Sequence, residues 1–148
     1  MRCLYKRPLP CTTGAVLRTL FNGWATARRF RVMDARVCRF GCADGDDSIE
    51  HYATCPAVYT AWEDFLGRTH QCSPLEFLCL GVEVDSIKRL RMAFLYCLYS
   101  VSMGLFAESS VVNTSGLILR IRERRRYVAG RSVEVRRDLK EASGTRCS

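Results

Sequence analysis

The sequence has only two histidines among its 148 residues, His51 and His70. It also has no glycine-rich loop of the kind that cradles a phosphate, and no set of serine, histidine and aspartate that would predict a nucleophilic triad. These absences leave no recognisable catalytic machinery. We therefore expect a protein that is not an enzyme.

A long uninterrupted apolar run is also missing. The apolar stretch from Met92 to Ala107 has sixteen residues and is interrupted by Ser100, Ser102 and Gly104. A helix needs about 20 predominantly apolar residues to span a bilayer. We expect this stretch to be a buried helix of a bundle, and we expect no membrane partner.

The N-terminus lacks a secretory signal, because prolines and a threonine pair interrupt "MRCLYKRPLPCTTGAVL", where a continuous apolar core is required. We expect an intracellular location, in the nucleus or the cytoplasm. In such a reducing compartment, clustered cysteines are metal ligands more often than disulfides. The first 33 residues carry seven basic and no acidic side chains. A mitochondrial presequence is therefore an alternative, although residues 16–30 are equally well explained as a packed helix.

Charge is distributed unevenly along the chain. Residues 1–37 carry eight basic and one acidic side chain (+7), residues 38–116 five and ten (−5), and residues 117–148 ten and four (+6), which sum to the net +8. Basic flanks favour a phosphate-bearing partner, because Arg and Lys release condensed counterions from nucleic acid. Solvated helix faces explain the same charge and are the favoured interpretation from charge alone, so a phosphate-bearing partner stays an alternative here.

Apolar periodicity and capping residues predict a mainly α protein with no internal repeat. The first helix is expected over about 14–31, capped by Thr12 or Thr13. Its predicted buried face consists of Val16, Leu17, Leu20, Phe21 and Trp24. A short helix should begin at Asp47, with Glu50 completing a capping box.

Another helix is expected from Pro56 to Gly67, because proline is favoured in a first helical turn and glycine just past a helix end. Its buried face would consist of Val58, Trp62, Phe65 and Leu66. A long helix is expected over about 86–107, capped by Asp85 or Ser86, and a basic helix to about Ala129, with the last dozen residues frayed. The predicted organisation is an irregular segment (1–13), a helical domain (14–110), and a linker with a basic C-terminal helix and tail (111–148).

Three cysteines and a histidine cluster in "CRFGCADGDDSIEHYATCP", residues 38–56. Structural zinc takes four thiolate or imidazole ligands in a tetrahedron, usually as two close pairs. Because His51 and Cys55 are four residues apart, they would share one face of the helix that begins at Asp47. We therefore predict a small helical domain organised around one structural zinc knuckle, with the ligand spacing Cys38-x3-Cys42-x8-His51-x3-Cys55.

The acidic loop between the two pairs offers a competing metal. Asp44, Asp46 and Asp47 are hard oxygen donors, but the glutamate that ends a calcium loop is missing and soft sulfur ligands stand close by, which favours zinc. Four protein ligands leave no open position for water, so the ion would be structural. Its binding free energy, on the order of 10 kcal/mol or more, would be folding free energy.

Two further interpretations of the cluster remain. The three cysteines could be buried small side chains, as Cys72, Cys79 and Cys97 are expected to be. Alternatively, His70 and Cys72 could replace a wrongly assigned ligand, although two residues in a loop are a weak signal.

The segment "TLFNGWATARRFRVMDARVCRFGCADGDDSIEHYATCPAVYTAWEDFL" resembles the zinc-binding region C-terminal to the reverse transcriptase of non-LTR (LINE-type) retrotransposons. That region shows an aromatic-rich helix, a basic turn, a cysteine pair, an acidic loop ending in Glu-His, a Cys-Pro and a tryptophan. The corresponding features are Trp24, Arg28–Arg29, Cys38/Cys42, Glu50–His51, Cys55–Pro56 and Trp62. The resemblance covers about residues 15–67. The family more often has gaps of two and four residues within the pairs, whereas both gaps are three here.

The resemblance implies a zinc-stabilised, non-catalytic module that helps a polymerase engage nucleic acid, with a retroelement polymerase chain as its partner. It does not imply polymerase activity, because the only Asp-Asp pair, Asp46–Asp47, lies inside the loop without the aromatic-alanine lead-in of a palm motif. The chain would be a detached or decayed piece of such an element.

The basic segments supply the residues that would contact an RNA or DNA backbone, with weak sequence preference because no stacking signature is present. The candidates are Arg28, Arg29, Arg31, Arg36 and Arg39, with Arg124, Arg125 and Arg126 adding non-specific affinity. The alternative function is a folded remnant or protein-interaction domain whose basic ends pack against the acidic middle.

Overall fold

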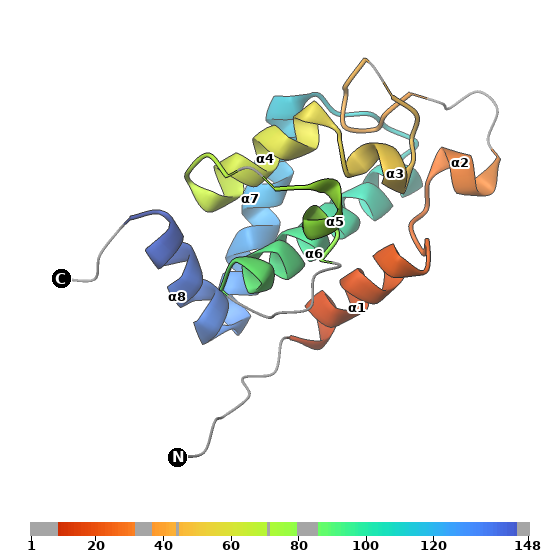
Figure 1. Cartoon of the computed structure of the whole chain (residues 1–148). Coiled ribbons are helices and arrows are strands. Elements are labelled where there is room, and N and C mark those ends of the chain that lie inside the picture. Colours follow the sequence, from red (N-terminus) through yellow and green to blue (C-terminus); the bar gives the residue numbers. More distant parts are fainter. Residues whose placement is uncertain (1–8, 32–36, 44, 71, 80–85, 145–148) are drawn as a thin grey trace.

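The structure is a computed structural model that describes residues 9–31, 37–43, 45–70, 72–79 and 86–144. These residues form helices and no strand, which confirms the prediction of a mainly α protein (Figure 1). The helices are α1 (Pro10–Leu20), α2 (Ala27–Phe30), α3 (Ile49–Tyr52), α4 (Pro56–Leu66), α5 (Pro74–Phe77), α6 (Ser86–Ala107), α7 (Thr114–Arg131) and α8 (Val133–Ala142).

Helix α6 is the central element, and it contacts α1, α4, α7 and α8. Figure 1 shows it running through the molecule beside α1, with α7 behind it. Its buried side chains recur every three or four residues and include Leu90, Phe94, Leu98, Val101 and Leu105. By length and composition α6 could cross a membrane, but 56% of its most apolar window is buried inside the protein. It therefore has the burial of a core helix, as the sequence predicted.

Helix α4 matches the sequence prediction closely. It begins at Pro56, ends before Gly67, and buries Val58, Trp62, Phe65 and Leu66. The ring centroids of Trp62 and Phe65 lie 5.3 and 5.4 Å from that of Phe94 in α6, in edge-to-face geometry. Such pairs add about 0.5–1.5 kcal/mol beyond their area burial, so this aromatic cluster anchors α4 on α6.

The N-terminal segment differs from the prediction of one helix over 14–31. Helix α1 ends at Leu20, and the chain turns through Asn22 and Gly23 before α2. The turn carries Trp24 into the core, where its indole N–H donates to the Thr19 hydroxyl at 3.0 Å.

The outer face of α1 is consequently apolar and exposed. Leu17, Leu20 and Phe21, which were predicted to be buried, are 48%, 48% and 80% exposed. The predicted threonine cap is also wrong. The N-cap is Leu9, and the Thr12 hydroxyl instead donates to the Leu9 carbonyl at 2.7 Å.

The C-terminal segment packs on the same core as the rest of the chain. Asn113 caps α7 by accepting from the Gly116 amide, and Ser132 caps α8. Helix α7 ends at Arg131, close to the predicted end. The predicted frayed end is wrong as far as Ala142, because α8 is a helix that buries Val135, Asp138, Leu139 and Ala142. Residues 145–148 lie outside the described residues.

Helix α8 is fastened to α6 by a buried ion pair. The Asp138 carboxylate, whose side chain is 1% exposed, accepts from Nε and Nη2 of Arg89 at 2.8 and 3.3 Å. The ion pair, together with the buried Val135, Leu139 and Ala142, holds this strongly charged segment against the protein.

We expect Asp138→Ala to lower the free energy of unfolding by about 3 kcal/mol, because it leaves the partly buried Arg89 guanidinium without its carboxylate. The measurement is urea unfolding followed by circular dichroism. Glu141→Ala is the control, since Glu141 is exposed and its contact with Arg137, at 3.7 Å, should contribute nothing measurable. Equal effects of the two variants would show that the pair does not hold α8.

Candidate metal centre

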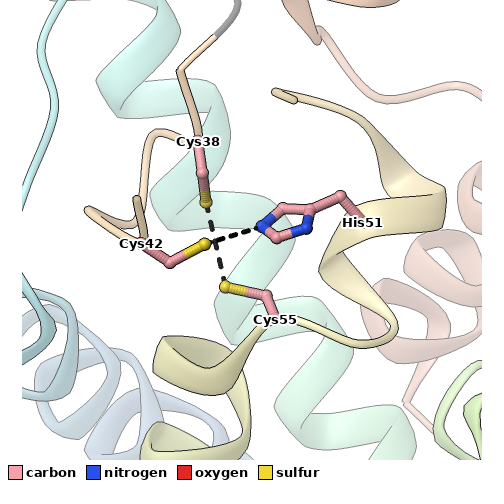
Figure 2. Close-up of side chains that lie close together, drawn as sticks. All are labelled: Cys38, Cys42, His51 and Cys55. Atoms are coloured by element: carbon pink, nitrogen blue, oxygen red, sulfur yellow. Dashed lines mark hydrogen bonds between the residues drawn. The ribbon is translucent and has the colours of Figure 1, made fainter. Parts of the chain in front are cut away.

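The structure brings together the four residues that the sequence predicted as metal ligands. The ligand atoms of Cys38, Cys42, His51 and Cys55 all lie within 4.8 Å of one another. Figure 2 shows the side chains converging from the loop before α3, from α3 itself, and from the residue that precedes α4. Among the described residues no other group of this kind is found.

The distances within the group suit a tetrahedral ion. The Sγ atoms of Cys38 and Cys55 are 3.8 Å apart, and Cys42 Sγ lies 3.0 Å from His51 Nε2. With metal–sulfur bonds of about 2.3 Å and metal–nitrogen bonds of about 2.0 Å, the corresponding tetrahedral edges are about 3.8 and about 3.5 Å. The first edge matches and the second is slightly contracted, so the group has the size to hold one metal ion.

Burial divides the group into an inner and an outer half. Cys38 and Cys55 are fully buried, whereas Cys42 and His51 are half-buried. An ion held there would be shielded by the core on one side and lie near the surface on the other.

Two glycines shape the loop that carries the first pair. Gly41 has φ +74°, a conformation that side chains rarely adopt, and a Cβ at this position would collide with the Val112 carbonyl oxygen. A Cβ at Gly45 would collide with the His51 ring. The amide of Cys38 donates to the Gly45 carbonyl at 3.0 Å and closes the loop. Because glycine has no side chain, Gly41 and Gly45 allow the loop to pack tightly against the segment before α7 and against His51, respectively.

The second pair is positioned differently from the prediction. The N-cap of α3 is Ser48, whose hydroxyl accepts from the His51 amide at 3.1 Å, and not Asp47. Helix α3 ends at Tyr52, so His51 and Cys55 do not share one helix face. Cys55 is instead the residue before the first turn of α4. A short helix and the start of the next one therefore supply the pair.

Asp47 has a role that the sequence prediction missed. Its side chain is fully buried, and its carboxylate accepts from the Ala27 amide at 2.7 Å, from Arg39 Nε at 2.7 Å and from the Tyr52 hydroxyl. These contacts join the loop that carries Cys38 and Cys42, called the metal loop below, to α2 and α3. Asp47 is consequently engaged inside the protein, which removes one of the oxygen donors that a calcium loop would need.

Arg39 extends the same network to α6. Its Nη1 donates to the Leu105 carbonyl at 3.3 Å, and its guanidinium lies 4.8 Å from the centroid of the Phe106 ring. The predicted role of Arg39 in contacting nucleic acid is therefore wrong, because the side chain is only 9% exposed and its charge is paired with Asp47.

The buried sulfurs of Cys38 and Cys55 form a hydrogen bond that favours the thiolate form of one of them. The hydrogen bond with Cys38 lowers the pKa of Cys55, against the opposing effect of burial, and the same hydrogen bond, together with burial, raises the pKa of Cys38. A proton shared by the two sulfurs accounts for both directions. Since the thiolate is the form that binds a metal, one ligand of the pair is prepared for it.

Two cysteines outside the group, Cys79 and Cys97, have the properties of buried core side chains. Burial raises the pKa of Cys79 to about 11 and that of Cys97 to about 12. His70 and Cys72, the alternative ligands, are not in the group of four. The His70 ring lies edge-on to Trp62 with centroids 6.1 Å apart, and burial raises the pKa of Cys72. No ligand has to be reassigned to complete the site.

The other predicted nucleic-acid contacts lie on two separate elements. Arg28, Arg29 and Arg31 are exposed on α2 and at its end. On α7, Arg124 and Arg126 are exposed and Arg125 is half-buried. Arg36 lies outside the described residues.

No family model matches the sequence, and no curated protein or solved structure matches it significantly. The candidate metal centre is therefore supported by the geometry of this chain alone.

The network around Asp47 leads to a stability prediction. We expect Asp47→Ala to lower the free energy of unfolding by about 3–5 kcal/mol, because it leaves the buried Arg39 guanidinium unpaired and removes the acceptor of the Ala27 amide and the Tyr52 hydroxyl. Urea unfolding measures the loss. Hydrogen exchange of the Ala27 amide should also accelerate.

Asp46→Ala is the matched control, since Asp46 is the neighbouring, exposed aspartate. It should leave both measurements unchanged. If Asp47→Ala were as stable as the control, the buried network would not be what holds the loop.

Proposed function

We propose that the protein binds one zinc ion through Cys38, Cys42, His51 and Cys55. Three sulfurs and one imidazole nitrogen form a soft ligand set, which suits zinc and disfavours calcium or magnesium. The single observation that carries this proposal is the convergence of all four ligand atoms within 4.8 Å. Because the protein supplies all four ligands, the ion is structural and the protein has no catalytic role at this site.

Zinc at this position stabilises more than the loop. The metal loop contacts α2 through Asp47, α6 through Arg39, and the segment before α7 through the Val112 amide, which donates to the Arg39 carbonyl at 2.9 Å. An ion that fixes the loop therefore also fixes the relative positions of these helices. Zinc binding is expected to contribute on the order of 10 kcal/mol to folding.

Native mass spectrometry should detect one zinc ion per chain, and chelation should reduce helicity and lower the unfolding temperature. Cys55→Ser should abolish zinc binding because it removes a buried thiolate ligand. Cys72→Ser is the control, since Cys72 is half-buried and outside the group, and it should retain the ion. A metal-free wild-type protein with full helicity would contradict the proposal.

We further propose that the module associates with the backbone of RNA or DNA inside the cell. The observation in its favour is the position of α2. The N-terminus of this helix is hydrogen-bonded to the metal loop, and its Arg28 and Arg29 side chains are exposed. The amides of Ala27 and Arg28 donate to the side chain and the carbonyl of Asp47 at 2.7 and 3.3 Å. The loop thus presents a cationic turn to solvent, where backbone phosphates can be contacted.

The resemblance of residues 15–67 to the zinc-binding region of non-LTR retrotransposon proteins supports the same proposal. On this basis the partner chain is a retroelement polymerase, and the module is an accessory that holds nucleic acid without reacting with it.

A protein-interaction or remnant domain is the second candidate function, and a specific observation favours it. Two arginines of α7 are paired with acidic residues of the middle segment: Arg122 with Asp64 in α4, and Arg120 with Glu108 after α6. These pairs reduce the charge available to a polyanion. The exposed apolar face of α1 would suit a protein partner.

Binding to a nucleic acid should weaken steeply with salt. We expect the triple variant Arg28→Gln/Arg29→Gln/Arg31→Gln to reduce the slope of log K against log salt concentration by about 2–3, because each phosphate contact contributes about 0.7–0.9. Fluorescence anisotropy with single-stranded RNA and DNA of equal length measures the slope.

The control, Lys88→Gln/Arg137→Gln/Lys140→Gln, removes three charges from α6 and α8 and should change the slope less. Binding by the wild-type protein that does not depend on salt, or no binding at low salt, would contradict the nucleic-acid proposal and favour the second candidate.

A further inference from the structure

Helix α7 carries a cationic cavity that is separate from the metal centre. The cavity has a volume of about 230 Å³ and is lined by Arg122, Arg125, Arg126 and Ala129. The three arginines are spaced i, i+3 and i+4, so their side chains emerge from one face of the helix. Ala129 lies one turn further along, and its short side chain leaves the space that the arginines surround.

Two of the three arginines are held in position by α4. Arg122 donates from Nε to Asp64 Oδ2 at 3.0 Å, and Nη2 also contacts the Asp64 carboxylate. The Arg125 guanidinium lies 5.5 Å from the centroid of the Phe65 ring. Side chains that are already ordered lose less entropy when a ligand binds. The cavity is therefore partly preorganised.

The charge of the cavity is only partly compensated. The Asp64 carboxylate interacts with Arg122 and Arg125, whereas the four residues that line the cavity carry three positive charges and no negative one. Burial lowers the pKa of Arg125, so its cationic form is partly stripped of water. An anion in the cavity would supply the missing hydrogen-bond acceptors, and guanidinium forks match the paired oxygens of a phosphate.

The volume restricts what the cavity can hold. Pockets that enclose drug-sized ligands have about 300–1,000 Å³, and this cavity is smaller. A phosphate group fits, and because the cavity is open to solvent, the attached sugar and base can extend outside it. Recognition would then be independent of the base and of the 2′-hydroxyl.

We propose that this cavity binds a single backbone phosphate of a nucleic acid, with Arg125 and Arg126 as its principal donors. The inference rests on the proposed nucleic-acid function and assigns one phosphate contact to a defined place on α7. Arg122 contributes mainly by orienting the site through Asp64. Arg124 is not among the residues that line the cavity. The arginines of the run Arg124–Arg126 therefore contribute unequally to phosphate binding.

The test uses the zinc-loaded full chain and single-stranded oligonucleotides of fixed length. Arg125→Gln/Arg126→Gln should reduce the slope of log K against log salt concentration by about one and weaken binding equally for RNA and DNA and for every base composition. The control, Arg120→Gln/Arg131→Gln, removes the same charge from the same helix outside the cavity. It should leave the slope nearly unchanged.

A second pair of variants addresses the cavity without touching an arginine. Ala129→Glu places a carboxylate beside the guanidinium groups and should abolish the contribution of the cavity to oligonucleotide binding. Ala129→Gln fills a similar volume without charge and should weaken oligonucleotide binding less. Unfolding midpoints of all variants verify that the fold is retained.

The outcomes separate the two proposals. Equal slopes for the cavity variants and their controls, in a protein that binds oligonucleotide, would overturn the cavity proposal and leave the nucleic-acid function standing. Failure of the wild-type protein to bind oligonucleotide at low salt would overturn both. Binding to vesicles of anionic phospholipid in preference to oligonucleotide, lost in Arg125→Gln/Arg126→Gln, would overturn the assignment to nucleic acid while locating a lipid phosphate in the same cavity.

Discussion

The carboxylate of Asp47 is withdrawn from water and is satisfied by donors from three parts of the chain: an amide of α2, the hydroxyl of Tyr52 and the guanidinium of Arg39. A buried charge costs several kcal/mol unless it is paired and hydrogen-bonded. The described residues around this pair therefore favour the conformation in which Arg39 and Asp47 stay paired, because separating them would leave two unpaired charges in the interior. That conformation is also the one in which the cysteines and the histidine meet. The ion pair thus favours the same loop structure that brings the four candidate ligands together.

The loop in turn determines how the outer elements are arranged. It contacts the end of α6 through Arg39 and the segment before α7 through Val112, while Gly41 lies directly against that segment. Helix α7 begins at Thr114, two residues after this contact. The start of the long basic helix is therefore fixed by the loop, although the two are more than 60 residues apart in the sequence. The candidate metal centre therefore lies at a junction of the fold.

The parts that could be predicted from the sequence are those with strong local signals. Proline and glycine bracket α4, an apolar repeat marks α6, and the Cys/His spacing predicts which four side chains meet in the candidate metal centre. The N-terminal helix was predicted too long, because Leu17, Leu20 and Phe21 have helical spacing on a face that the core does not cover. Asp47 and Ser48 are both good capping residues, and only tertiary burial decides between them. The docking of α8 depends on Asp138 meeting Arg89, a contact across 49 residues that periodicity cannot reveal.

The compactness of the metal centre has a consequence for folding during synthesis. Its four ligands span only residues 38–55, and the pairing of Arg39 with Asp47 lies inside the same interval. Closing so short a loop costs little chain entropy, and contacts of this kind form early. The core helix α6 and the basic helix α7 are made later. We expect these residues to come together while the growing chain still lacks both helices, so that the junction exists before the elements that assemble on it.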